Sequence, residues 1–204
     1  MKTIRVILAL VAAAGLAACA DTNLVSRNAS PNAPLLNAAP EAVQTPSYNV
    51  TALNVVVPET LKVSEANSFY PGADIVWRGD PFGNRHQQIK AMFEAGMGKG
   101  IARLNGGTDV IVDIVVQRFH SVTERTRYTV GGVHSIRFAM TIRDAATGAV
   151  LEPTRVIEAD LNAFGGLAAV RAEAIGQTQK VRITEHLEKV ILHELTKPRD
   201  FLQV

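Results

Sequence analysis

Hydrophobic residues recur with two periods between about residue 48 and residue 198. Runs rich in β-branched residues predict strands at residues 50–57, 110–119, 133–143 and 155–163. The run at 110–119 begins apolar on both faces, which favours a central strand. The run at 133–143 alternates, so one face of its strand is expected to carry His134, Ile136, Phe138, Met140 and Ile142.

Two longer segments carry apolar residues at helical spacing. The first follows Asp80 and the proline after it, which suit an N-cap and a first helical position, and it runs to about residue 104. Three glycines weaken it by about 1 kcal/mol each relative to alanine but allow close packing against a sheet: Gly96, Gly98 and Gly100. The second helix follows Thr178, a good N-cap, and ends before Pro198.

These elements, with a shorter helix at about residues 167–174, have the main order β-α-β-β-β-α. That order predicts an α+β fold, a two-layer sandwich with a mixed, mostly antiparallel sheet and two helices on one face. The irregular residues 59–83 either cover the second face of the sheet or leave it to solvent.

Residues 1–18 are expected to be a lipoprotein signal peptide. Lys2 and Arg5 precede an uncharged apolar run that is too short to span a bilayer. The run ends in Leu16-Ala17-Ala18-Cys19, which resembles the bacterial lipobox and contains the only cysteine of the chain. By that resemblance Cys19 becomes an acylated N-terminus that anchors the protein to a membrane. The alternative is an ordinary signal peptide with an incidental cysteine.

The segment after the signal peptide indicates how the domain is carried. Ala20 stands where an aspartate would retain a Gram-negative lipoprotein on the inner membrane. An alanine at this position points to the outer membrane, on the periplasmic face, with the inner membrane as the alternative. Residues 19–47 read as the lipidated cysteine and a tether rich in proline, asparagine and alanine, which holds the folded domain, residues 48–204, off the bilayer.

Charge and cysteine content exclude several classes of protein. The chain has 21 basic and 19 acidic residues, and loss of Lys2 and Arg5 with the signal peptide leaves it formally neutral. A nucleic-acid partner captured by bulk charge is therefore excluded. A single cysteine excludes an intramolecular disulfide and a cysteine-rich metal site. We expect no cofactor.

Two histidines form the sharpest candidate for catalysis. If the hairpin after the second long strand centres near Arg127, His120 and His134 face each other across two strands, close enough to share a metal ion or a proton. A zinc site needs a third protein ligand, and none is evident near them. The alternative is that both imidazoles simply line the end of a strand.

A second candidate lies in the loop from Asp74 to Asp80. It holds the only tryptophan of the chain, Trp77, beside Arg78, a composition typical of binding hot spots. We therefore predict partner binding through Asp74, Trp77, Arg78 and Asp80. The alternative is that Trp77 closes the core while Arg78 pairs with one of the two aspartates.

Several segments resemble an uncharacterised family of alphaproteobacterial lipoproteins. They are residues 64–67, Tyr70-Pro71-Gly72-Ala73-Asp74-Ile75-Val76-Trp77-Arg78-Gly79-Asp80-Pro81, Arg118-Phe119-His120, residues 131–138 and Gly176-Gln177-Thr178. The resemblance covers essentially the whole folded domain but implies no activity. The element order is also similar to that of periplasmic lipoprotein domains that assist envelope transport or assembly.

Two functions remain open from the sequence. The first is a non-catalytic binding or accessory module, held in the periplasm by its lipid anchor, whose partner is an envelope protein, peptidoglycan or lipid. The second is a metal-dependent or histidine-based periplasmic hydrolase that uses His120 and His134.

Overall fold

The computed structural model describes residues 45–198, so Cys19, the expected signal peptide and most of the expected tether lie outside the described residues. The described elements lie within one compact unit, Ala42–Val204. In chain order they are β1 (Tyr48–Val56), β2 (Ile75–Val76), α1 (Arg85–Ile101), β3 (Thr108–His120), α2 (Glu124–Arg127), β4 (Gly132–Asp144), β5 (Val150–Glu158), β6 (Leu161–Ala163), α3 (Gly166–Ala174) and α4 (Gln179–Thr196).

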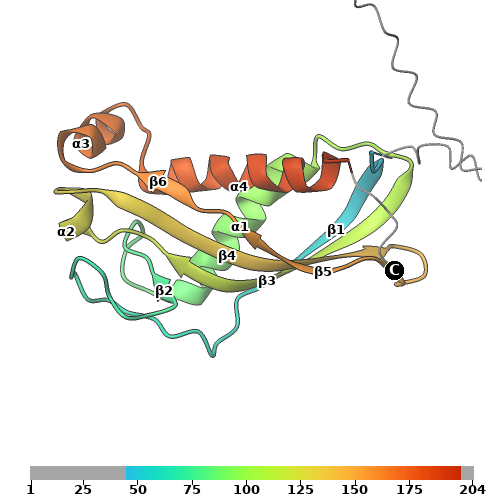
Figure 1. The fold of residues 1–204 in the computed structure, drawn as a ribbon, viewed down its shortest axis with the longest axis horizontal. Coiled ribbons are helices and arrows are strands. Elements are labelled where there is room, and N and C mark those ends of the chain that lie inside the picture. Colours follow the sequence, from blue (N-terminus) through green and yellow to red (C-terminus); the bar gives the residue numbers. More distant parts are fainter. Residues whose placement is uncertain (1–44, 199–204) are drawn as a thin grey trace, which may run out of the picture. The chain divides into compact units, whose positions relative to one another are not determined.

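The strands form one mixed sheet. Its order is β1-β3-β4-β5, with the two-residue β2 beside the end of β3 and β6 beside the start of β4 (Figure 1). β1 and β2 run parallel to β3, and β3, β4 and β5 are antiparallel neighbours. The predicted α+β class and the central position of the 110–119 strand are confirmed. The strand predicted at 155–163 is instead two strands, β5 and β6.

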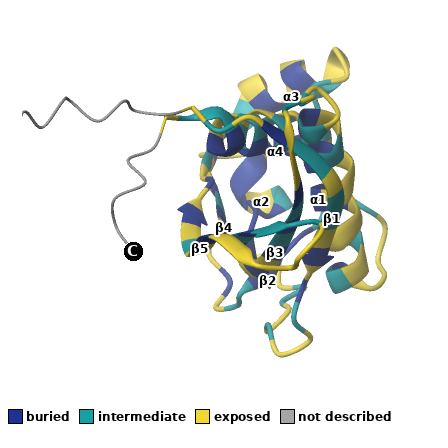
Figure 2. Ribbon diagram, turned by 90° about the vertical axis from the view of Figure 1, so that its right-hand side faces the viewer, coloured by how far each residue is buried: buried dark blue, intermediate teal, exposed yellow. Residues whose placement is uncertain are grey.

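Both long helices pack on one face of this sheet, as predicted (Figure 2). The core between the layers is aromatic at its centre: the ring of Phe93 in α1 meets Phe138 edge-on, with centroids 5.6 Å apart, and Phe119 lies 6.3 Å away. Alternation along β4 holds, because the inward side chains predicted there are all buried. Helix α4 contributes a buried stripe at helical spacing: Ile183, Leu187, Ile191 and Leu195.

The glycines of α1 bring that helix against α4 rather than against the sheet. A Cβ at Gly96 would lie 2.6 Å from the Thr184 carbonyl oxygen, and one at Gly100 would lie 2.5 Å from Cγ2 of Ile191. Gly98 faces open space. The expectation of close packing is confirmed for Gly96 and Gly100, although they contact α4 and not the sheet, and it is wrong for Gly98.

The start of α1 also differs from the prediction. Its N-cap is Asn84, whose Oδ1 accepts a hydrogen bond from the Gln87 amide at 3.0 Å. Asp80 does not cap this helix, because its carboxylate is bound by Trp77 and Lys180 instead. The predicted cap of the last helix is confirmed: Thr178 Oγ1 accepts from the Val181 amide at 3.3 Å.

The outer face of the sheet is only partly covered. The segment before β2 lies against one end of it, where the Tyr70 ring stacks on His120 with centroids 4.4 Å apart. Farther along the same face, Val56, Val115 and Val156 remain exposed. The two expectations for residues 59–83 therefore each hold for part of this face.

Candidate functional site

A β-bulge in β3 decides where the two candidate histidines lie. Val116 pairs with Phe138, but two residues later Arg118 pairs with Arg137, so Gln117 is an extra residue. Beyond the bulge His120 pairs with Ser135. Side chains alternate between faces along a strand, so His120 lies on the outer face and His134 on the helix-covered face. The prediction that they face each other is therefore wrong.

His120 is held under the loop before β2. Its Nε2 donates to the Pro71 carbonyl oxygen at 2.8 Å, and its ring stacks on Tyr70. A carbonyl oxygen only accepts hydrogen bonds, so we assign the ring proton to Nε2. The side chain is nearly fully buried. His120 thus fixes the loop to the end of the sheet.

His134 lies in the core, at the first turn of α4. Its Nδ1 is 2.9 Å from Oγ of Ser121, which donates to Oε1 of Gln179 at 2.9 Å. Because the hydroxyl proton goes to Gln179, we assign the imidazole proton to Nδ1. Nε2 is then a buried acceptor with no hydrogen-bond partner. Burial, reinforced by the charges of Arg182 and Arg127, lowers the pKa of His134 to about 3.

No metal centre forms around either ring within the described residues. Across residues 45–198, His, Cys, Asp and Glu side chains make no group of three that could hold an ion. The same range contains no helix with the length and hydrophobicity needed to cross a lipid bilayer.

The second predicted site, around Trp77, is structural. Trp77 is fully buried, meets Phe119 edge-on, and donates from Nε1 to Asp80 at 2.9 Å. The prediction that Trp77 is a surface contact is therefore wrong, and the alternative that it closes the core is confirmed. Asp80 also accepts from Lys180 of α4 at 2.7 Å. Burial opposes its ionisation, but these two hydrogen bonds, together with the charges of Lys180 and Arg85, outweigh that effect and lower its pKa.

The neighbouring charges are also used within the protein. Arg78 pairs with Glu124 of α2 and donates to the Glu65 carbonyl oxygen at 2.7 Å. Asp74 accepts from the Lys62 amide at 2.9 Å. The expectation that Arg78 pairs with one of the two aspartates is thus wrong. The loop from Asp74 to Asp80 joins α2, α4 and the core.

The structure instead places a cavity at this end of the outer face. Its volume is about 410 Å³, and it lies between the loop before β2, the end of β3, the segment joining α2 to β4, and the turn after β5. We call this cavity the distal pocket. It is lined by Phe69, Tyr70, His120, Ser121, Val122, Thr126, Val130, Gly131, Gly132, Val133, Ser135 and Asp160.

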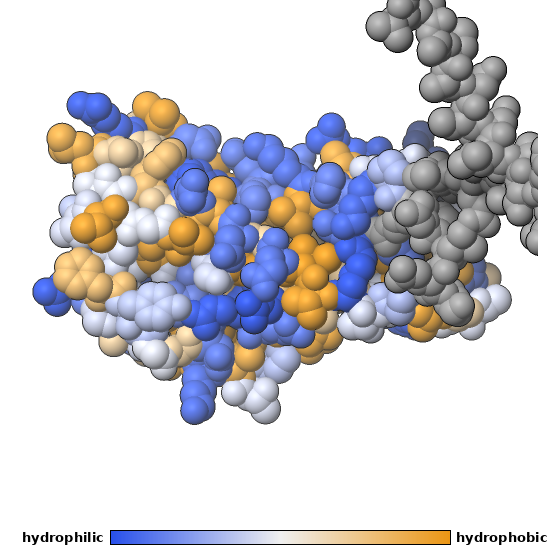
Figure 3. Space-filling model, viewed as in Figure 1, coloured by the Kyte–Doolittle hydropathy of each residue, from blue (hydrophilic) through white to orange (hydrophobic). Residues whose placement is uncertain are grey.

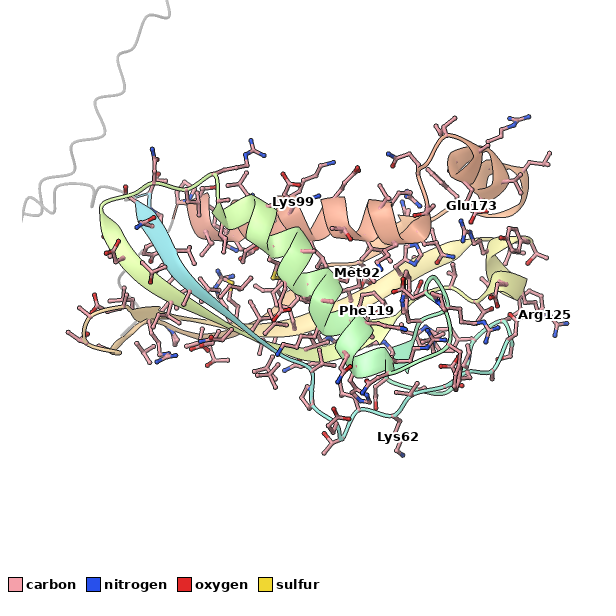
Figure 4. The ribbon with its side chains drawn as sticks, turned by 180° about the vertical axis from the view of Figure 1, so that it is seen from behind. Lys62, Met92, Lys99, Phe119, Arg125 and Glu173 are labelled. Atoms are coloured by element: carbon pink, nitrogen blue, oxygen red, sulfur yellow. The ribbon has the colours of Figure 1, made fainter. Side chains whose placement is uncertain are left out.

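Exposed hydrophobic side chains surround the pocket and continue onto α3. We call them the distal apolar surface, made up of Phe69, Tyr70, Tyr128, Val130, Val133, Phe164, Leu167, Val170 and Ile175. Figure 3 shows hydrophobic residues gathered over this end, and Figure 4 labels two charged residues at the same end, Arg125 of α2 and Glu173 of α3. It is the end of the sheet opposite to the start of β1 (Figure 1).

Close backbone contact joins the two halves of this surface. A Cβ at Gly165 would lie only 2.2 Å from the Gly131 amide nitrogen, so both segments need a glycine at this contact. Arg127 pairs with Glu173, which links α2 to α3. Sequence reasoning missed this site because its residues come from segments that lie far apart in the sequence, between Phe69 and Asp160. The only local signals were the glycine pairs and the aromatic pair at Phe69.

Comparison with known protein families assigns the chain to a family but gives it no activity. Residues 48–203 match DUF6778, a family of unknown function. The chain belongs to this family. Membership in DUF6778 confirms the resemblance to an uncharacterised family and supplies no activity. No match was found among curated proteins.

Solved structures similar to this DUF6778 chain are distant. Protein XCC0632 from Xanthomonas campestris, of the DUF330 family, matches 74% of this chain and 87% of its own, with 11% identity and a TM-score of 0.45. An uncharacterized protein matches 75% and 93%, with 11% identity and a TM-score of 0.40. A candidate lipoprotein from Caulobacter crescentus CB15 matches 52% and 79%, with 14% identity and a TM-score of 0.31. At these values the likeness brings no function to this chain.

Proposed function

We propose that the protein is a lipoprotein of the cell envelope, anchored through Cys19 to the periplasmic face of the outer membrane. Its folded domain is a non-catalytic binding module. The observation that carries the binding role is the distal apolar surface with its pocket. Solvent-exposed apolar patches of this kind mark binding sites in soluble domains.

The position of this surface fits a tethered module. The described chain enters the fold at the start of β1, and the distal apolar surface lies at the opposite end of the sheet (Figure 1). A domain held by its N-terminal side thus keeps this end free for a partner in the envelope. The formal neutrality of the chain without its signal peptide favours a local apolar contact over capture by long-range charge.

A hydrolase built on the two histidines finds less support. His134 is buried and neutral, and His120 is bound to Pro71 on the other face of the sheet. A shared metal ion or proton would need both rings in one site. The binding module is therefore the better proposal.

Site-specific photo-crosslinking in cells tests the binding role. A photoreactive residue is placed at Leu167 or at Val130, both of which are exposed, and at Val150 as a control at the far end of β5. A discrete adduct of the same mass at the two distal positions, and none at Val150, supports the proposal. Equal labelling at all three positions, or none, contradicts it.

The anchor is tested separately by fractionation. Cys19→Ser removes the only thiol that can be acylated. We expect loss of the mature, membrane-bound form, with the protein accumulating as an uncleaved or unanchored species. A Cys19→Ser variant that reaches mature size and stays with the outer membrane would rule out the lipobox.

A further inference from the structure

The distal pocket has the chemistry of a site for a hydrocarbon chain. Its volume of about 410 Å³ lies within the range of about 300 to 1,000 Å³ that is usual for small-molecule sites. Its walls include Phe69, Tyr70, Val130 and Val133, which are all exposed to solvent. A ligand that covered these side chains would remove from water the apolar surface that folding leaves exposed, and this burial would favour binding.

Most polar groups that line the pocket are already bound to the protein. His120 donates to Pro71, Ser121 bonds to Gln179, and Thr126 donates from Oγ1 to the Phe69 carbonyl oxygen at 2.9 Å. These groups therefore offer little to a polar ligand. Three lining residues remain that can meet one: Ser135, Asp160 and Tyr70, whose hydroxyl accepts from Arg118 at 2.8 Å and can still donate its own proton.

The charge of the lining disfavours an anionic ligand at the end of the pocket that carries Asp160. No lysine or arginine is among the residues that line the pocket. Asp160 is exposed there, and only its Oδ1 is engaged, by the Ile136 amide at 2.9 Å. A carboxylate or phosphate near this aspartate would meet a like charge, and the two arginines that contact the lining, Arg118 and Arg125, do so at Tyr70 and Phe69. An uncharged chain end meets no such cost.

We propose that the distal pocket binds an uncharged alkyl chain, with any polar end group held near Ser135 and Asp160. This inference deepens the proposed function, since it names the ligand chemistry of the same surface. The chain can belong to a free long-chain alcohol or to the apolar part of a larger lipid. In both cases the protein recognises hydrocarbon and rejects an anionic group at the pocket.

Binding is measured with the chain from residue 20 onward, because Ala42–Val204 is a compact unit by itself and no detergent is then needed. The neutral fluorescent probe N-phenyl-1-naphthylamine is bound first and then displaced by n-alcohols of increasing length. Each added methylene should tighten binding about fourfold until the cavity is full. The fatty acid of matched length should bind more weakly than the alcohol at pH 8.

Three variants locate the ligand. Ser135→Leu fills the cavity from its floor on β4 and should weaken alcohol binding at least tenfold. Thr141→Leu is the matched control, since Thr141 lies on the same strand and face but outside the pocket. Asp160→Asn keeps an oxygen for the Ile136 amide but removes the charge, so it should raise the affinity for the fatty acid to that of the alcohol.

Thermal melts of all three variants establish that the fold is retained. Affinity that is independent of chain length, or a folded Ser135→Leu that binds like wild type, overturns the proposal. An Asp160→Asn variant that still prefers the alcohol overturns the role of its charge. If alkyl chains do not bind but the crosslinks at Leu167 and Val130 form, this inference fails and the proposed function stands.

Discussion

His120 and His134 project from opposite faces of the sheet. His120 pairs with Ser135, so the two histidines miss direct cross-strand pairing by one register position. Continued past Val116, the first part of the β3–β4 register would pair the two histidines. The extra residue at Gln117 shifts the pairing by one, and a shift of one residue moves a side chain to the other face. One bulge thus separates a loop anchor from a buried core imidazole.

Replacement of His134 with glutamine should change how stability depends on pH. In the folded chain His134 stays neutral down to about pH 3, whereas its ordinary pKa is 6.5. The unfolded chain therefore binds an additional proton below pH 6.5, and the free energy of unfolding falls as the pH drops toward 3. The limiting slope is about 1.4 kcal/mol per pH unit.

Urea denaturation of wild type and His134→Gln at pH 8, 6 and 5 measures this effect. The carboxylates titrate alike in both proteins, so the difference in stability isolates the histidine. Wild type should lose more stability than the variant between pH 6 and pH 5. Parallel losses would mean that the imidazole is already protonated in the folded state or is exposed.

The three glycines of α1 should respond differently to alanine. Gly96→Ala and Gly100→Ala place a methyl group against α4 and should destabilise the protein by about 1 to 3 kcal/mol. Gly98→Ala meets nothing within 4 Å and should stabilise the helix by up to about 1 kcal/mol. Chemical denaturation distinguishes the two signs. If all three substitutions stabilise, α1 and α4 are not in close contact.

Trp77→Ala should destabilise the domain by about 3 to 5 kcal/mol, because it empties a fully buried site beside Phe119. Phe82→Ala, two residues after the loop that holds Trp77, removes an exposed ring and should change stability by less than about 0.5 kcal/mol. A thermal melt compares the two. Similar small effects would show that Trp77 is not a core residue.

Arg127→Ala should loosen α3 from the rest of the domain. The Arg127 side chain is largely buried and pairs with Glu173, which would be left without its cation. We expect faster amide hydrogen exchange in α3 and a loss of about 1 to 3 kcal/mol. Arg171→Ala, on α3 itself but exposed, is the control and should leave exchange unchanged.

The elements were largely predictable because each depends on a local pattern. Alternation along β4 identified the buried face from His134 to Ile142, and Thr178 marked the start of α4. The roles of Trp77 and the glycines of α1 were harder to predict. A residue type indicates that burial or close contact is possible, but it does not identify the partner. Trp77 and Gly96 find their partners in segments distant in the sequence.

The candidate sites were less predictable for a different reason. A cross-strand pair depends on register, and a single bulge at Gln117 has no clear signature in the residues around it. The distal pocket is built from strand ends and loops that meet only after β3, β4 and β5 have paired. Its residues share no spacing that a periodic pattern could reveal.

The parallel pairing of β1 with β3 determines when the sheet can begin to form during synthesis of the chain. β1 is synthesised first, yet its hydrogen-bonding partners in β3 follow about sixty residues later. Until β3 has emerged, the first strand and α1 have no sheet to join, and contacts this distant in sequence form slowly. Under the export proposed for this protein, N-terminus first, this delay would keep the leading half unfolded while it crosses the membrane.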